Sequence, residues 1–465
     1  MSADVFLINP LPDARGINEA TIEAPLGILY IASFLESNGL TCEVIDANAI
    51  SLKEDDLIAR VVRAAPSLVG ISVNAFTYSA ALSYAKKIKN SLPAATVILG
   101  GPQPTAAPEF CLEDSNVDAV VRGEGEAAVC AIAGNLKARL SPFKDVPGVV
   151  YRSAGKLIFN PPARRITGLD SLPFPAYHLL PSLKHYNSRT RKRPFMGIIT
   201  SRGCPYRCSF CSKDVFGDTV TFRSPENVIS EIEFLAKDMG IKQIDILDDN
   251  FTLDRARCEE ICRLVIGRSL KLAINLQSGV RVENMDKEML LLFKRAGVFK
   301  IALGVESADE DVLRGARKKA DLDKILKISS LARESGIVVV GFFMIGLPGD
   351  NPGAMRRTLD FAKRMDPHIA NFMITVPFYG TSLYRTIEEK GRFLVDTKRG
   401  ASMGFYGGEA FFEMGDIKRE DVIYWYQKSY RDFYFRISKA IDLVSTIRTW
   451  HELRWFFSVA CNIMR

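Results

Sequence analysis

Short apolar runs alternate with amphipathic segments along the first 140 residues of the chain. Five apolar runs of three to six residues predict buried strands at residues 5–9, 42–47, 68–73, 97–99 and 119–121. Between them apolar side chains recur every three or four positions, which predicts helices at residues 26–38, 53–65, 78–92 and 126–136. This alternation indicates an α/β fold, here a doubly wound, Rossmann-like parallel sheet. Such a sheet binds its ligand at the carboxyl ends of its strands.

The same alternation resumes at residue 195 and repeats six times. Strand-like runs stand at residues 195–200, 243–248, 272–276, 300–304, 338–345 and 371–376, with helical patterns between them. Six such units predict a partial (β/α)6 barrel of the TIM type, whose chemistry lies at the carboxyl ends of the strands. A β-hairpin is expected at residues 148–165, with its turn at Ser153-Ala154-Gly155.

These patterns divide the chain into four predicted regions. They are a Rossmann-like domain at residues 1–140, a linker with the hairpin at residues 141–192, the partial barrel at residues 193–391 and a helical, aromatic and basic C-terminal region at residues 392–465. All three tryptophans, Trp425, Trp450 and Trp455, lie in the last region. Aromatic residues at helical spacing favour helices that pack on the barrel. The alternative is a surface that contacts a membrane or lines a hydrophobic substrate entrance.

Composition narrows the protein class. A chain of 465 residues with 47% hydrophobic residues can bury two or three cores. The N-terminus lacks a basic region followed by an apolar one, and no apolar run reaches the roughly 18 residues that cross a bilayer, so we expect a cytoplasmic protein. Nine cysteines without dense spacing fit a reducing compartment. The net charge of +7 is diffuse and does not indicate nucleic-acid binding.

Three cysteines carry the strongest chemical signal. Cys204, Cys208 and Cys211 stand in the sequence Cys-Pro-Tyr-Arg-Cys-Ser-Phe-Cys, and no fourth cysteine follows closely. Three thiolates can hold a 4Fe–4S cluster and leave one iron open to a ligand that is not protein. A structural zinc site would want a fourth Cys or His nearby, and three unrelated buried thiols are the other alternative. The spacing therefore predicts an iron–sulfur cluster with an open iron.

This segment resembles the radical S-adenosylmethionine (SAM) enzymes. Their signature is Cys-x3-Cys-x2-Cys with an aromatic residue before the last cysteine, which is Phe210 here. The resemblance implies that SAM chelates the open iron and is cleaved by the reduced cluster to methionine and a 5′-deoxyadenosyl radical, which removes hydrogen from a substrate. It also implies an external electron donor of the flavodoxin or ferredoxin type.

Polar residues follow the predicted barrel strands, where the family binds SAM. The resemblance places the methionine amino group at the second strand and the carboxylate and ribose at the third and fourth. The six residues so assigned are Asp248, Asp249, Asn250, Ser278, Arg281 and Glu306. The alternative is a local role: Asp254 is expected to cap a helix, and Asp248 or Asp249 could cap a turn.

Glycines and small polar residues mark the strand ends of the N-terminal domain. The order Pro25-Leu26-Gly27, Asp46-Ala47, Gly100-Gly101-Pro102-Gln103-Pro104-Thr105 and Arg122-Gly123-Glu124-Gly125-Glu126 resembles the cobalamin-binding domain of one large radical SAM subfamily. The resemblance implies a cobalamin site that includes Asn74, Gly100, Gly101, Gln103, Gly123 and Glu124. No histidine lies in the first 150 residues, so this domain offers cobalt none. A purely structural domain and a nucleotide site are the alternatives.

The two cofactors are expected to carry out different steps of one reaction. In the resembling family the commonest activity is methylation of an unactivated carbon, where the adenosyl radical removes a hydrogen and methylcobalamin delivers the methyl group. One alternative is radical oxidation, cyclisation or ring rearrangement without methyl transfer, and another is a non-enzymatic cobalamin or redox sensor. The substrate is expected to be a small molecule, and lipid, tetrapyrrole and natural-product scaffolds stay open.

Overall fold

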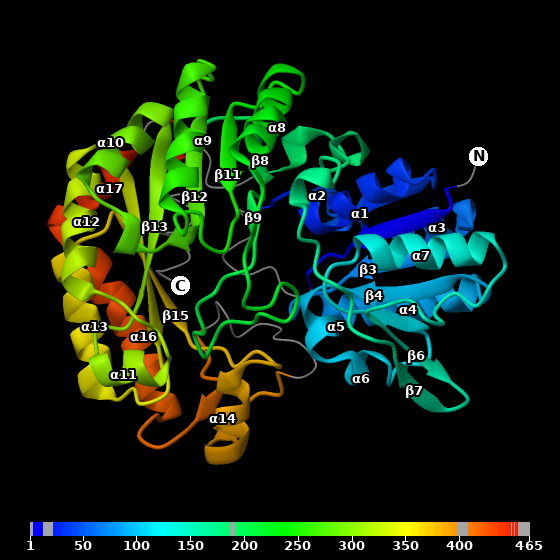
Figure 1. Cartoon of the computed structure of the whole chain (residues 1–465). Helices are drawn as coiled ribbons and strands as arrows, with labels where there is room; N and C mark the ends of the chain where they lie inside the picture. Colours follow the sequence, from blue (N-terminus) through cyan, green and yellow to red (C-terminus); the bar gives the residue numbers. More distant parts are fainter. Residues whose placement is uncertain are drawn as a thin grey trace.

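Two predominantly parallel β-sheets lie side by side and form the two halves of the molecule (Figure 1). The computed structural model describes residues 3–12, 22–186, 191–397, 408–447, 449–450 and 452–453. Trp455, which the sequence placed in the helical tail, lies outside the described residues. The α/β fold class predicted from the sequence is confirmed, with a Rossmann-like sheet, a partial barrel and C-terminal helices.

The N-terminal sheet has the strand order β2-β1-β3-β4-β5-β6-β7. Its parallel strands are β1 (Val5–Asn9), β2 (Cys42–Asp46), β3 (Leu68–Ser72), β4 (Thr96–Gly100) and β5 (Ala119–Val121). Its helices are α1 (Leu26–Ser37), α2 (Ala47–Ile50), α3 (Glu54–Ala64), α4 (Tyr78–Ser91), α5 (Pro102–Ala106), α6 (Pro108–Cys111) and α7 (Glu126–Lys137). Val5 and Leu7 belong to one core and Phe6 and Ile8 to another, because successive strand side chains point to opposite faces. Helices therefore cover both faces of this sheet.

The predicted hairpin is present and extends the sheet. Strand β6 (Val149–Ser153) pairs antiparallel with β5 and with β7 (Lys156–Phe159). Ala154 and Gly155 join β6 to β7 with φ angles of 47° and 77°. Two consecutive left-handed residues give the tight turn that suits the twist of a hairpin.

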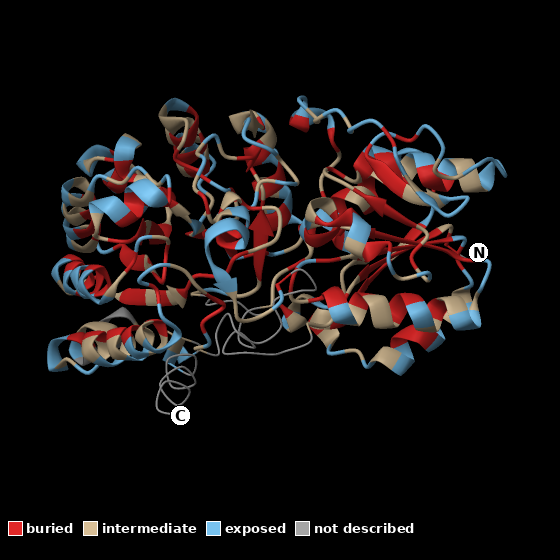
Figure 2. Cartoon of the chain, turned by 90° about the horizontal axis from the view of Figure 1, so that it is seen from below, coloured by how far each residue is buried: buried red, intermediate tan, exposed pale blue. Residues whose placement is uncertain are grey.

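The second sheet runs in the order β15-β14-β13-β12-β11-β8, and every pair in it is parallel. Its strands are β8 (Phe195–Ile198), β11 (Gln243–Ile246), β12 (Ala273–Val280), β13 (Val298–Glu306), β14 (Val338–Ile345) and β15 (Ile369–Ile374). Its helices are α8 (Pro225–Lys237), α9 (Arg255–Gly267), α10 (Lys287–Ala296), α11 (Glu310–Gly315), α12 (Leu322–Glu334), α13 (Pro352–Met365) and α14 (Ser382–Lys390). This arrangement is the predicted partial barrel, with buried residues along the strands and on the inner faces of the helices (Figure 2).

Side-chain caps start the barrel helices. Ser224, Asp254, Asp286, Asp321 and Asn351 each accept a hydrogen bond from a backbone N–H in the first turn of the helix that follows. These bonds satisfy donors that a helix N-terminus leaves free. The capping role expected for Asp254 is confirmed, and it leaves that residue outside the chemistry.

Short elements complete the second half. They are β9 (Ser201–Arg202), β10 (Thr221–Phe222), β16 (Arg392–Phe393), β17 (Phe412–Glu413) and the 3-10 turns η2 (Leu169–Ser171), η3 (Tyr177–Leu179), η4 (Leu183–His185) and η5 (Val282–Asn284). Strands β9 and β10 pair with each other and bracket the segment that holds the three cysteines. That segment therefore begins and ends at one small ribbon.

The C-terminal helices α16 (Arg419–Tyr434) and α17 (Ile437–Thr446) pack on the barrel. Tyr430 and Phe433 of α16 contact the Phe372 ring of β15 with centroid distances of 5.5 and 6.0 Å. Trp425 is buried and Trp450 is exposed. The prediction that the aromatic tail packs as helices thus holds for α16. Among the described residues, no helix has both the length and the apolar character to cross a membrane.

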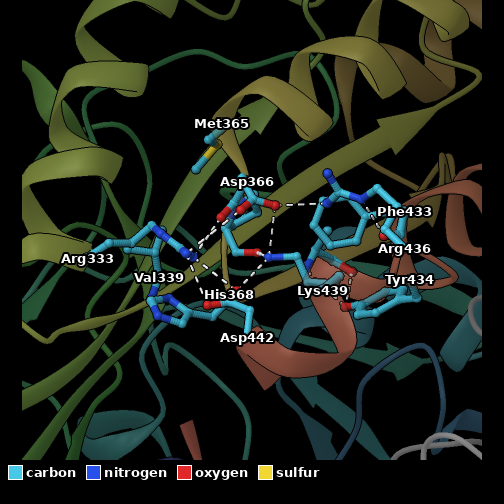
Figure 3. A network of polar contacts seen from close by, with 12 residues as sticks. Arg333, Val339, Met365, Asp366, His368, Phe433, Tyr434, Arg436, Lys439 and Asp442 are labelled. Carbon is cyan, nitrogen blue, oxygen red and sulfur yellow. Dashed lines mark hydrogen bonds and ion pairs between the residues drawn. The ribbon is translucent and has the colours of Figure 1, made fainter. Parts of the chain in front are cut away.

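A charged network holds α17 at the amino-terminal edge of the barrel strands (Figure 3). Lys439 is fully buried and donates to Asp442 at 2.7 Å and to the Pro367 carbonyl at 2.8 Å. Its ammonium also pairs with Asp366 at 3.0 Å, and Arg333 binds Asp442. A buried ammonium requires such partners, so the network fixes where α17 docks.

A second buried network joins the two halves. Arg202 of β9 donates to Glu124 at 2.6 Å and to Glu126 at 2.7 Å, and all three side chains are about 95% shielded from water. The guanidinium also lies over the Tyr30 ring, 5.0 Å from its centroid. Because each partner is desolvated, removal of one leaves the others unpaired.

Replacement of Arg202 tests this junction. Arg202→Met should lower the free energy of unfolding by about 3–5 kcal/mol, because two buried carboxylates lose their counter-charge. Arg207→Met, which breaks an exposed pair with Asp218, should cost less than about 1 kcal/mol. Urea unfolding followed by tryptophan fluorescence and circular dichroism measures both, and equal losses would contradict a structural role for the Arg202 network.

Candidate active site between the two sheets

The three cysteines lie on the segment that runs from β9 to β10, between the two sheets (Figure 1). Gly203 precedes Cys204 with φ of 92°, and a Cβ at this position would overlap the Thr219 carbonyl oxygen. Only glycine allows this close approach. The turn is further fixed by Asp249, which accepts a hydrogen bond from the Gly203 N–H at 3.1 Å.

Hydrogen bonds connect this cysteine segment to the residue that follows α11 and to α14. The Ser209 N–H donates to the Ala316 carbonyl at 2.8 Å, and the Ser209 carbonyl accepts from the Leu383 N–H at 2.9 Å. Lys213 donates to the Cys204 carbonyl at 2.8 Å. Phe210 packs on a small apolar cluster that includes Val312. The segment is thus held by its backbone, and its thiols are left to other partners.

The three thiols are free and close enough to act on one another's charge. None forms a disulfide. Burial, Asp249 and the other two thiols raise the pKa of Cys211 to about 11, and burial raises the pKa of Cys208. Iron would supply the positive charge that favours the thiolates. Among the described residues no three His, Cys, Asp or Glu side chains converge on a single metal ion. A 4Fe–4S cluster needs no such convergence, because each thiolate binds a different iron.

The predicted SAM-binding carboxylates of the second barrel strand differ in their surroundings. Asp248 is buried, and its two oxygens accept from the Thr200 N–H, the Thr200 hydroxyl and the Ser201 hydroxyl. These bonds give it a positioning role, because they fix the chain that leads to the cysteine segment. Asp249 is exposed and faces Cys211 and Gly203. Loss of surrounding water raises the pKa of the buried Asp248 carboxyl.

Asn250 presents a polar atom without a partner. Its side chain is buried, its Oδ1 accepts from the Thr252 hydroxyl at 3.2 Å, and its Nδ2 has no hydrogen-bond acceptor. An unsatisfied buried donor costs free energy, so this atom suits an oxygen of a bound molecule. Ser278 lies exposed near the end of β12, where Gly279 turns the backbone with φ of 97°.

A cationic pair flanks Cys208. The charges of Lys318 and Arg281 both act on its thiol and oppose the effect of burial on its pKa. Glu306, with an unusual φ of 65°, pairs with Lys318 at 3.1 Å. The Arg281 guanidinium stacks on the Tyr206 ring, 3.7 Å from its centroid, and binds Glu283. A cavity of about 610 Å³ adjoins this group and is lined partly by Tyr206, Arg281, Glu283 and Lys318.

Sequence reasoning missed Lys318, Glu283 and Tyr206 at this position. Lys318 stands in an ordinary basic run, Arg317-Lys318-Lys319, and nothing in that run links it to the cysteines. Tyr206 lies between the first two cysteines, so its place in the motif was the one available signal. Phe210, which was singled out, contacts the apolar cluster.

Glycines shape the facing edge of the N-terminal sheet. Gly101 has φ of 109°, and a Cβ there would strike the Val73 carbonyl oxygen. A Cβ at Gly100 or Gly123 would make only ordinary contacts, at 3.7 Å or more, so the backbone at this edge is partly exposed and not crowded. Thr105 joins the two turns, since its hydroxyl donates to Gly101 and accepts from the Gly123 N–H. Gln103 is buried beside them. Exposed backbone between strand ends fits the close approach of a large cofactor such as cobalamin.

Two residues predicted for cobalamin have other partners. Glu124 accepts from Arg202 and, at 2.8 Å, from the Ile166 N–H, so both of its oxygens are occupied at the junction of the two halves. The Asn74 Oδ1 accepts from the Phe76 N–H at 2.8 Å and closes a local turn. The structure thus gives Glu124 an ion pair at the junction and Asn74 a turn, and their assignment to the cobalamin site stays a prediction.

The two strand-end edges meet at one turn of the barrel. A Cβ at Gly380 would lie 2.9 Å from the Asp214 carboxylate of the cysteine segment and 3.1 Å from Ala106 of α5. The Phe378 ring contacts Phe76, which follows β3. The cysteine segment, the glycine edge and the barrel therefore share one junction.

Known proteins resemble both halves. Residues 198–362 match the Radical SAM superfamily and residues 15–133 match the B12 binding domain. An uncharacterized methyltransferase of Pyrococcus horikoshii is 32% identical over 366 residues, 78% of each chain. Anaerobic magnesium-protoporphyrin IX monomethyl ester cyclase of Rubrivivax gelatinosus is 27% identical over 83% of this chain and 70% of that one. The fold resembles that of TsrM from Kitasatospora setae, a radical SAM methyltransferase whose structure was solved with cobalamin and a 4Fe–4S cluster bound. The TM-score is 0.72 and the sequence identity is 18%, and the match covers 96% of this chain and 89% of that one.

Gly203 gives a test of the cysteine segment. Gly203→Ala should abolish most cluster assembly, because its Cβ would push Thr219 away and displace Cys204. Gly217→Ala is the matched control, since Gly217 has φ of 67° in the same segment but open space around it. Iron and sulfide content per chain after anaerobic reconstitution measures the effect. Similar iron content in the two variants would show that the Gly203 turn does not position the thiols.

Proposed function

The chain belongs to the cobalamin-dependent radical SAM enzymes, and from this premise we propose that it transfers a methyl group to an unactivated carbon of a small molecule. The observation that carries the proposal is the junction at Gly380, where α5 of the cobalamin-binding half and the cysteine segment contact the same turn. Methyl donor and radical source must act on one substrate carbon, so their sites have to be neighbours.

When bound, the cluster, SAM and cobalamin supply a hydrogen-abstracting radical and a methyl group. The chain holds and orients them. We assign Cys204, Cys208 and Cys211 to three irons of the cluster. Asp249 is assigned to the SAM amino group, because its carboxylate is exposed and acts on the Cys211 thiol.

The polar groups around Cys208 and the second strand suit the remaining polar parts of SAM. Arg281 and Lys318 offer cations to its carboxylate, since both act on the Cys208 thiol. Glu306 can accept from the ribose hydroxyls while it pairs with Lys318. Asn250 offers its free Nδ2 to an oxygen of SAM.

The chemistry of the target explains why both cofactors would be needed. An unactivated carbon has no lone pair with which to attack a methyl sulfonium, so ordinary polar methyl transfer fails. Removal of a hydrogen first creates a reactive centre at that carbon. A cobalamin bound at the glycine-lined edge, next to the cysteine segment, would bring the methyl donor within reach of that carbon.

A second function has a specific observation in its favour. The relative from Rubrivivax gelatinosus is named as a cyclase, and its similarity extends over 83% of this chain. A radical oxidation or cyclisation would use the same cofactor sites without methyl transfer. Product stoichiometry separates the two.

Methyl transfer predicts equal amounts of two products from SAM. Anaerobically reconstituted enzyme with cobalamin, SAM and a strong reductant should form one S-adenosylhomocysteine for each 5′-deoxyadenosine when substrate is present, as measured by chromatography. Cys208→Ala should form no 5′-deoxyadenosine, whereas Cys130→Ala, a partly buried thiol of α7, should behave as wild type. Formation of 5′-deoxyadenosine without S-adenosylhomocysteine would indicate the cyclase-type reaction. Absence of both products from the cofactor-loaded enzyme would contradict catalysis and favour a sensor.

Asn250 gives a test of SAM binding. Asn250→Leu removes the free Nδ2 donor and should weaken SAM binding about 5- to 150-fold, which corresponds to the roughly 1–3 kcal/mol of a buried hydrogen bond. Asn116→Leu, in a distant turn of the N-terminal half, is the matched control and should leave the affinity unchanged. Calorimetric titration of the reconstituted protein measures both. Unaltered affinity in Asn250→Leu would remove this residue from the SAM site.

A further inference from the structure

A row of polar residues crosses the concave face of the barrel. Asp245 of β11 is in register with Asn275 of β12, which is in register with Lys300 of β13. Residues in register on parallel strands share a face of the sheet. Their neighbours Ile244 and Ile274 belong to the core that includes the barrel helices, so the polar row faces the interior of the barrel.

Hydrogen bonds connect this row into a chain. Gln243 donates to Asp245 at 2.7 Å, and Asn275 donates through its Nδ2 to Asp245 at 3.0 Å and to the Gln277 side-chain oxygen at 3.2 Å. Gln277 in turn donates to Glu23 at 2.6 Å. The amide donors of these residues are therefore already used inside the chain.

Glu23 comes from the cobalamin-binding half and reaches into this barrel network. It precedes α1 in the sequence, and its partner Gln277 stands near the carboxyl end of β12. Burial and the nearby Asp245 carboxylate together raise the pKa of Glu23 to about 7, although Gln277 and Lys300 oppose the shift. Ionisation of Glu23 beside the Asp245 carboxylate is therefore unfavourable unless a bound group adds positive charge.

Acceptors exceed donors at this point. The Oδ1 atom of Asn275 is buried without a hydrogen-bond donor, although the Nδ2 atom of the same amide is used twice. Rotation of the amide would face its oxygen toward the oxygens of Asp245 and Gln277, so the present orientation is the favourable one. A buried acceptor without a donor costs free energy. A bound N–H group would satisfy it.

The other side of the concave face is apolar. Val340 of β14 and Ile369 of β15 are in register, and they cluster with Ala302, Phe342 and Leu443 of α17. Ala302, Val340 and Ile369 are already buried against α17, whereas the partly exposed Phe342 of β14 offers apolar surface to a molecule in the barrel. This division suits an amphipathic molecule with a donor group at one end.

We propose that Glu23 and Asn275 form a subsite for a protonated amine of the substrate, whose apolar body lies toward Phe342 of β14. This inference rests on the proposed function, since it concerns the substrate of the same site. Glu23 and Asp245 share the nearby charge of Lys300, so an ammonium group supplies both N–H donors and a second positive charge. A carboxylate at this place would meet Glu23 and Asp245 and would be repelled.

Binding of simple probes tests the subsite without knowledge of the substrate. The probes are octylamine, octanol, octanoate and octyltrimethylammonium, titrated calorimetrically into the cofactor-loaded full chain. Octylamine should bind most tightly, because octanol lacks the charge, octyltrimethylammonium lacks N–H donors and octanoate carries the wrong charge. Tighter binding of octanoate, equal binding of octanol and octylamine, or no octylamine binding at millimolar concentration would overturn the proposal.

Glu23→Gln keeps the size of the side chain and removes its charge. It should weaken octylamine binding at least tenfold and leave octanol binding unchanged. Glu36→Gln, which removes a carboxylate paired with His178 in the same half, is the matched control and should bind as wild type. Equal octylamine affinity in wild type and Glu23→Gln would overturn the subsite. Formation of 5′-deoxyadenosine and S-adenosylhomocysteine by the same preparations tests the proposed function separately.

The pH dependence of wild type gives a second test that requires no variant. Octylamine stays protonated from pH 5.5 to 8.5, while Glu23, with its pKa of about 7, changes from neutral to ionised. Affinity should therefore rise about 30-fold over this range, because only the ionised carboxylate attracts the ammonium. The charged groups that act on Glu23 are Asp245 and Lys300, and Gln277 is its hydrogen-bond donor. A flat profile would overturn the role of Glu23.

Discussion

The buried ion pairs of Arg202 with Glu124 and Glu126 fix the geometry on which the rest of the site depends. Arg202 ends β9 directly before Gly203 and Cys204, while the two glutamates stand at the glycine-lined edge of the N-terminal sheet. Buried charges cannot separate without a cost of several kcal/mol, because water does not replace the lost partner. The pairs therefore hold the cysteine segment and the cobalamin-side edge in one relative position.

Backbone crowding adds a second constraint at the same place. Gly203 and Gly380 both have positive φ, and both face atoms that a Cβ would strike. Gly203 allows two backbones to approach closely, and Gly380 leaves room for the Asp214 carboxylate and the Ala106 Cβ. The result is a junction in which close contacts bring together the cysteine segment, α5 and the turn after β15. Such a junction suits the proposed function, in which two large cofactors have to act on one substrate.

Most of the fold was predictable because the periodicity of buried residues carries it. Strand β14 and the cap at Asp254 were predicted at the positions where they occur, since each follows from a local pattern. Strand β12 was predicted to end at Leu276 but extends to Val280, through the polar Gln277 and Ser278. Its length is set by pairing with β13 across an irregular register, and no property of the β12 sequence reports that partner.

The sequence by itself determined the cysteine triplet, the strand-end positions and the two-sheet architecture, because spacing and periodicity are local properties of the chain. Only the tertiary structure decided which polar groups are engaged. It gave both oxygens of Asp248 to Thr200 and Ser201, paired Glu124 with Arg202, and brought Lys318 beside Cys208. It also carried Glu23 into the barrel of the other half. Partners so far apart in sequence meet only through folding, so their hydrogen bonds and charges leave no pattern along the chain.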